Sequence, residues 1–166
     1  VLQHDPFASR YFTKLEELTR AALDACGDRY WVGYTDFHPS LDCIAAWRGL
    51  DALFVDLATA PEKLDALVGL SVRDFHRIFD HFDHMLGERG QPSITWLNLP
   101  CPGPFHIPSC DVAAMISTSH FRQFSLPQLR RERCPPMLVL GAVGILLQEL
   151  ERAKTATAAL AEAQSS

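Results

Sequence analysis

Two carboxylates and a histidine stand directly after predicted strands, where such side chains commonly do chemistry. Asp36 ends the β-prone run RYWVGYTD, His38 follows it, and Asp111 comes after the extended piece FHIPSC. In parallel sheets ligands bind beyond the carboxyl ends of the strands, because loops and helix N-termini converge there. A carboxylate at such a place can hold a cation or transfer a proton, and histidine suits acid–base work near neutral pH. We therefore predict Asp36, His38 and Asp111 as catalytic residues.

Two further side chains beside these strand ends are predicted to contact a substrate. Trp96, in the run SITWLNL, could supply a flat wall for an aromatic ligand, and Cys110 directly precedes Asp111. Each has a simpler interpretation. Tryptophan is often a core residue, a single cysteine is often a small apolar filler, and aspartate is a preferred N-cap of a following helix.

Metal binding is a weaker interpretation of the same region. His106 and Cys110 lie near Asp111, but their spacing is not that of a recognised closed zinc site. His76, Asp80 and His84 repeat every four residues on a predicted helix, opposite its phenylalanine stripe. That placement is typical of a solvated face, so we predict no metal site.

The elements that must position these residues alternate between helical and β-prone patterns. Apolar residues recur at helical spacing over 6–25, over 40–60 with a break near Gly49, and over Pro61 to Leu86. The β-prone or extended runs are 29–36, 93–99, 106–110 and 136–141. Helical pattern also follows Asp111, with Ser117 as a predicted N-cap and a kink at Pro127, and returns in an alanine-rich tail. Strands that alternate with helices predict the α/β class with a parallel sheet.

Composition limits the function classes. The chain has 166 residues, 48% of them apolar, and a formal net charge of −5. The charges are interspersed, so neither a nucleic-acid nor a membrane partner is predicted. The longest apolar run, Met137 to Leu147, is shorter than the roughly 20 residues of a membrane span. The five cysteines include no CxxC pair and follow no signal peptide, which predicts reduced thiols and a cytoplasmic location.

Two blocks of the sequence resemble the uroporphyrinogen decarboxylase superfamily. The stretch PSCDVAAMISTSHFRQFSLPQLRRE is similar to that family's acid, small-residue turn and "SPE(M/F)F…F(V/A)LPYLR" helix. YWVGYTDFHPSLDCIAAWRG, followed by LFVDLATAPEKLDALVGLSVRDF, resembles its glycine-bearing strand, proline-containing loop and following helix. The similarity covers residues 30–134, leaving 135–166 as a divergent tail, and the nearest likeness is to decarboxylase-like members without an assigned substrate.

The resemblance implies a fold and two alternative activities. The fold would be a partial (β/α)8 TIM barrel in a single domain over 1–166, because a complete barrel takes about 250 residues. The first activity is decarboxylation of a tetrapyrrole-type substrate without a cofactor. The second is corrinoid-dependent methyl transfer, in which zinc activates a thiol. The chain starts without methionine, so we expect a fragment, and a non-catalytic fragment that associates through exposed sheet edges is a third possibility.

Overall fold

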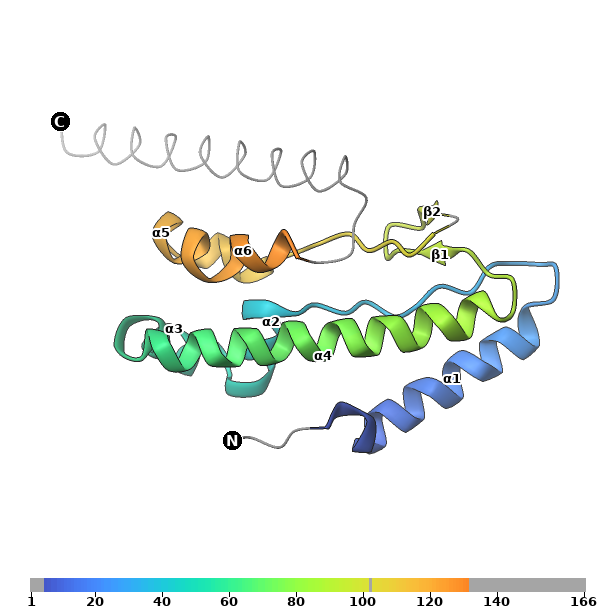
Figure 1. Cartoon of the computed structure of the whole chain (residues 1–166), viewed down its shortest axis with the longest axis horizontal. Helices are drawn as coiled ribbons and strands as arrows, with labels where there is room; N and C mark the ends of the chain where they lie inside the picture. The colour runs from blue at the N-terminus through green and yellow to red at the C-terminus, as the bar shows by residue number, and fades with distance from the viewer. Residues whose placement is uncertain (1–4, 102, 132–166) are drawn as a thin grey trace.

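The computed structural model describes residues 5–101 and 103–131, which are mainly helical (Figure 1). The helices are η1 (Pro6–Ala8), α1 (Arg10–Cys26), α2 (Ser40–Arg48), α3 (Leu50–Thr59), α4 (Pro61–Gly87), η2 (Asp111–Met115), α5 (Thr118–His120), the π-helical η3 (Phe121–Ser125) and α6 (Leu126–Leu129). The strands are β1 (Ser93–Ile94) and β2 (Pro100–Cys101).

The predicted helices form where the apolar periodicity places them. The Ser9 hydroxyl caps α1 by accepting from the Tyr11 amide at 3.2 Å. Gly49, with φ +82°, separates α2 from α3 at the predicted break, because that backbone conformation suits glycine. Pro61 occupies the first turn of α4, where its missing N–H costs nothing. Ser117 caps α5 as predicted, accepting from the His120 amide at 3.1 Å.

The predicted partial barrel is wrong for the part of the chain that the structure describes. Its one sheet there is the antiparallel β1–β2 pair, with Ser93 opposite Cys101 and Ile94 opposite Pro100. The predicted strand 93–99 turns back on itself, since Asn98 takes the left-handed φ of +57° and its amide bonds the Thr95 carbonyl at 2.8 Å. Asparagine tolerates that conformation, so a local turn replaces a longer strand.

The other predicted strands are extended segments held by side chains instead of a backbone ladder. The Val32 amide donates to Gln91 Oε1 at 2.9 Å, and the Tyr34 hydroxyl donates to the Phe105 carbonyl at 2.5 Å. The Phe105 amide in turn donates to the Ser93 hydroxyl at 3.2 Å. Such contacts keep 28–39 and 103–110 near α4 without pairing them as a parallel sheet. The predicted strand 136–141 and the alanine-rich tail lie outside the described residues.

Buried apolar residues form two clusters, and α4 contributes to both. The α3 cluster comprises Leu41, Ile44, Leu53, Leu57, Leu64, Val68, Val112, Ile116, Phe121, Phe124 and Leu129. The α1 cluster comprises Leu23, Cys26, Val32, Tyr34, Phe75, Phe79, Phe82, Met85 and Leu86. Along α4, the buried polar residues Ser71 and Asp74 lie between Val68 of one cluster and Phe75 of the other. We call this junction the seam.

The described helices were also compared with the requirements of a membrane span. None of those formed by residues 5–101 and 103–131 combines the length and apolar character needed to cross a bilayer.

Candidate functional site

A hollow of about 260 Å³ opens at the seam and is lined from η1, the end of the extended segment 28–39, α2 and α4. Its lining residues are Pro6, Asp36, Phe37, His38, Pro39, Cys43, Trp47, Ser71, Asp74, Phe75 and Ile78. Aromatic and aliphatic side chains form most of the wall, and a few polar groups converge on it. This composition is typical of a small-molecule site. We call it the seam hollow.

Asp36 and His38 form a hydrogen-bonded pair on this hollow. His38 Nε2 lies 2.8 Å from Asp36 Oδ2, and the side chains are 25% and 47% exposed, respectively. The other ring nitrogen of His38, Nδ1, is buried and has no hydrogen-bond partner among the described residues. A carboxylate on one nitrogen orients the imidazole ring. The pair can therefore donate or accept a proton at the edge of an apolar hollow.

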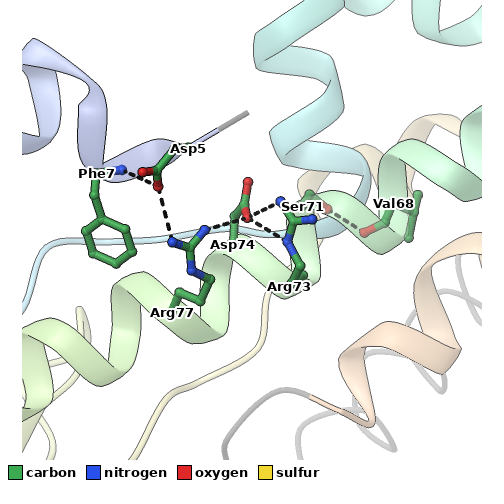
Figure 2. A network of polar contacts seen from close by, with 7 residues as sticks. All are labelled: Asp5, Phe7, Val68, Ser71, Arg73, Asp74 and Arg77. Atoms are coloured by element: carbon green, nitrogen blue, oxygen red, sulfur yellow. Dashed lines mark hydrogen bonds and ion pairs between the residues drawn. The ribbon is translucent and has the colours of Figure 1, made fainter. Parts of the chain in front are cut away.

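A strained turn holds the pair at the start of α2. Ser40, two residues after His38, is buried and has φ +64°, which a residue with a side chain adopts only at a cost. Its amide donates to the Ser71 hydroxyl of α4 at 2.9 Å, and that hydroxyl donates to the Val68 carbonyl at 2.8 Å. The Ser71–Val68 bond appears in Figure 2. The turn is thus fixed to the seam by a buried hydrogen bond.

Asp74 adds a buried negative charge to the wall of the hollow. Its side chain is 6% exposed, and Arg73 contacts Oδ1 through Nε at 3.0 Å and Nη2 at 2.8 Å (Figure 2). Arg77 lies 3.7 Å from the same oxygen and donates to Asp5 at 3.2 Å. Asp5 also accepts from the Phe7 amide at 3.3 Å, so this network fastens η1 to α4. Guanidinium groups on the outside therefore balance the buried carboxylate.

Cys43 lines the same hollow but is not a nucleophile at neutral pH. Burial raises the pKa of its thiol to about 12, and the nearby carboxylates of Asp74 and Asp42 act in the same direction. Only the thiolate attacks carbon or binds a metal well. Cys43 therefore contributes a neutral, weakly polar surface to the hollow.

Asp111 is joined to this region through Asp42, in the first turn of α2. Asp42 Oδ2 accepts from the Asp111 amide at 2.8 Å, and Asp42 Oδ1 accepts from the Val112 amide at 2.9 Å. The Asp111 side chain is exposed and accepts from the Ser109 hydroxyl at 3.3 Å. The N-terminus of η2 is thus satisfied by Asp42, and the simple N-cap interpretation of Asp111 is replaced by a long-range one.

The two predicted substrate contacts lie elsewhere. Cys110 is half-buried, packs against the α3 cluster and has its sulfur 3.4 Å from the Ser125 hydroxyl oxygen. Trp96 is 45% exposed and lines a separate hollow of about 400 Å³ together with Trp31, Gly33, Tyr34, Ile94, Thr95 and Asn98. We call this second space the tryptophan hollow. The tryptophan that lines the seam hollow, and could supply a flat wall for an aromatic ligand there, is Trp47.

His106 is a core residue. It is fully buried, its ring centroid lies 4.8 Å from that of Phe75, and its Nδ1 lies 3.4 Å from the Tyr34 hydroxyl oxygen. Burial, with a smaller contribution from the nearby His38, lowers the pKa of His106 to about 4, and Asp36 opposes this shift. No group of three or more metal-binding side chains occurs among the described residues. The donors there do not fit the zinc implied by the methyltransferase alternative.

The chain was compared with protein-family models, with curated proteins and with solved structures, and none of the three comparisons finds a match.

Asp42, Trp47 and Asp74 are residues of this region that the sequence analysis did not select. Asp42 and Trp47 come from the helix that directly follows His38 and Pro39, so proximity in the chain is a usable signal for them. Asp74 stands within the apolar stripe of α4, between Val72 and Phe75. A carboxylate among such neighbours points to a polar junction in the core.

Proposed function

We propose that the protein binds a nitrogen-containing aromatic molecule in the seam hollow and removes a carboxyl group from it, in the manner of the uroporphyrinogen decarboxylase superfamily. The observation that carries the proposal is the Asp36–His38 pair, with 2.8 Å between its nitrogen and oxygen, on a hollow with aromatic walls. The sequence resemblance supplies the reaction class. A tetrapyrrole-type substrate remains a prediction of that resemblance, and a cytoplasmic location remains a prediction from the pattern of cysteines.

The chemistry of the hollow suits this reaction. Decarboxylation of a pyrrole acetate begins with protonation of the ring, which makes it cationic. The C–C bond to the carboxylate then breaks, its electron pair neutralises the ring and carbon dioxide leaves. The exocyclic methylene group takes up a proton to become a methyl group, and the ring returns its first proton to the site, so that one proton is consumed overall. His38 can supply the first proton, and the carboxylate of Asp36 beside it favours the cation.

The size of the hollow limits which part of the substrate it takes. Ligand sites usually measure about 300–1,000 Å³, and the seam hollow, at about 260 Å³, lies just below that range. It therefore suits one pyrrole ring with its acetate side chain, and the rest of a larger molecule would lie over the exposed face of Trp47. Stacking of a ring on tryptophan is favourable.

The experiment is anaerobic incubation of the whole chain with uroporphyrinogen, followed by measurement of carbon dioxide and of the porphyrin products. We expect turnover by the native chain and a loss of about 10²- to 10⁴-fold in Asp36→Asn and in His38→Gln. The exposed Asp51→Asn, on α3, is the matched control and should retain activity. Absence of both binding and turnover in the folded native chain would contradict the proposal.

A second candidate function is supported by the extended segments. Residues 30–37 and 104–109 are extended but are not strands of the described sheet, and Trp31, within the first segment, is 62% exposed. An extended segment with an exposed apolar side chain can pair with an added strand of another chain. The protein would then be an interaction module that completes a sheet with another chain. Sedimentation over a wide concentration range tests this, since a module of this type associates and binds apolar dyes, whereas a chain that remains monomeric and dye-free is not one.

A further inference from the structure

We propose that Asp42 is a positioning residue that joins the Asp111 segment to the Asp36–His38 pair, making one site from parts that are distant in sequence. This inference rests on the proposed function for its consequence, but not for its geometry. Asp42 and Asp111 are 69 positions apart, and their contact is a direct hydrogen bond of 2.8 Å.

The geometry requires a carboxylate at position 42. Each oxygen of Asp42 accepts from a different amide, one from Asp111 and the other from Val112. Asparagine has only one side-chain acceptor, and its NH₂ group would face the second amide donor. Cys110, at the N-cap of η2, makes no capping bond with its side chain. No other described group replaces Asp42 in holding this end of η2.

The charge of Asp42 also couples the parts electrostatically. Burial raises the pKa of Asp42, the two backbone hydrogen bonds lower it, Asp111 repels the ionised form and His38 attracts it. The attraction by His38 shows that Asp42, in the first turn of α2, lies within electrostatic reach of the Asp36–His38 pair. Cys43, the neighbour of Asp42 in α2, is held as the neutral thiol and does not compete for the proton.

These interactions connect four residues of the site one after another. Asp36 contacts His38, His38 is attracted to Asp42, and Asp42 holds the backbone of Asp111. The start of η2, with the exposed side chain of Asp111, is thereby tied to the first turn of α2. The Asp111 segment and the Asp36–His38 pair are therefore both held at the start of α2.

The test compares the native chain with Asp42→Asn by NMR of the whole protein. We expect the Asp111 and Val112 amides to lose their downfield shifts and to exchange about tenfold faster, since charge-assisted hydrogen bonds are lost. The imidazole resonances of His38 should also shift. A residue that only stabilised η2 would change the two amides and leave the His38 ring unchanged, and that result would overturn the proposal.

Two controls keep this test decisive. Asp51→Asn, in the first turn of α3, removes an exposed carboxylate and should leave all these resonances unchanged. If Asp42→Asn does not fold, Asp42→Glu replaces it. A glutamate carboxylate that still reaches both amides leaves all three signals unchanged, as the requirement for a carboxylate predicts, and one that does not reach them should shift the two amides and the His38 ring together. Shifts of the two amides with the His38 ring unchanged would overturn the proposal. The proposed function fails separately, through absence of turnover in the native chain, because the NMR result does not depend on activity.

Discussion

The seam hollow and the tryptophan hollow are both bounded by aromatic side chains, but they differ in what holds their polar groups. The seam hollow brings Asp36, His38 and Asp74 together between α2 and α4, and buried hydrogen bonds fix its turn. The tryptophan hollow is larger, at about 400 Å³ against about 260 Å³, and its lining contains no carboxylate or imidazole. We therefore select the candidate site by its convergent, fixed titratable groups and not by its volume.

The position of the seam hollow follows from how α4 meets the two core clusters. Its first half packs into the α3 cluster and its second half into the α1 cluster, with Ser71 and Asp74 between them. A junction of two apolar clusters can bury polar groups and still leave an opening to solvent. The tryptophan hollow lies instead between an extended segment and the turn at Asn98, away from the junction of the two clusters along α4.

The largest expected effect on the free energy of unfolding comes from protonation of His106. Its neighbour Phe75 lines the seam hollow, and its neighbour Tyr34 lines the tryptophan hollow. The folded pKa of His106 lies below its ordinary value, so the unfolded chain binds the proton more tightly. Its contribution to stability is complete above about pH 6.5 and is lost as the pH falls through about 4. The difference between 6.5 and about 4 corresponds to about 3 kcal/mol.

Urea unfolding at pH 7 and at pH 4 measures this effect. The free energy of unfolding should fall by up to about 3 kcal/mol more in the native chain than in His106→Phe, which keeps the aromatic packing. The exposed His84→Gln variant is the control and should behave as the native chain does. An equal loss with and without His106 would show that other groups cause the acid sensitivity.

Two buried hydroxyl groups, one beside each hollow, should differ in how much they contribute to the free energy of unfolding, and this effect is smaller. Ser71→Ala leaves the buried Ser40 amide without its acceptor and should cost about 1–3 kcal/mol. Thr95 Oγ1, beside the tryptophan hollow, is buried with no hydrogen-bond partner among the described residues. Thr95→Val should therefore be neutral or stabilising by less than about 1 kcal/mol. Equal destabilisation by both variants in thermal unfolding would remove the distinction that we draw.

The sequence predicted the helices better than the strands because helical periodicity is a local property. The stripe of α4 was sufficient to place Pro61 and the end near Leu86, and the structure ends the helix at Gly87. The β-prone runs were ambiguous, since a strand also needs a partner. Tyr34 and Val32 instead bond the Phe105 carbonyl and the Gln91 side chain, which no local pattern indicates.

The candidate site was predictable only where its residues are near neighbours in the chain. Asp36 and His38 share a segment, and the structure places both on the seam hollow. Asp42 lies close to His38 in the chain, but the contact that gives Asp42 its role is with Asp111, 69 positions away, and no local pattern indicates it. Trp96 and Trp47 look alike as sequence signals, and only the packing of α2 against α4 brings Trp47 to the hollow. Long-range packing decided each of these cases.

The most direct test of the account is to ask which hollow takes the ligand. The chain contains three tryptophans, so 5-fluorotryptophan labelling gives one fluorine resonance for Trp47 in the seam hollow and two for Trp31 and Trp96 in the other. On titration with uroporphyrinogen we predict that the Trp47 resonance shifts and that the other two remain fixed. Shifts of Trp31 and Trp96 with Trp47 unchanged would contradict the assignment of the site to the seam.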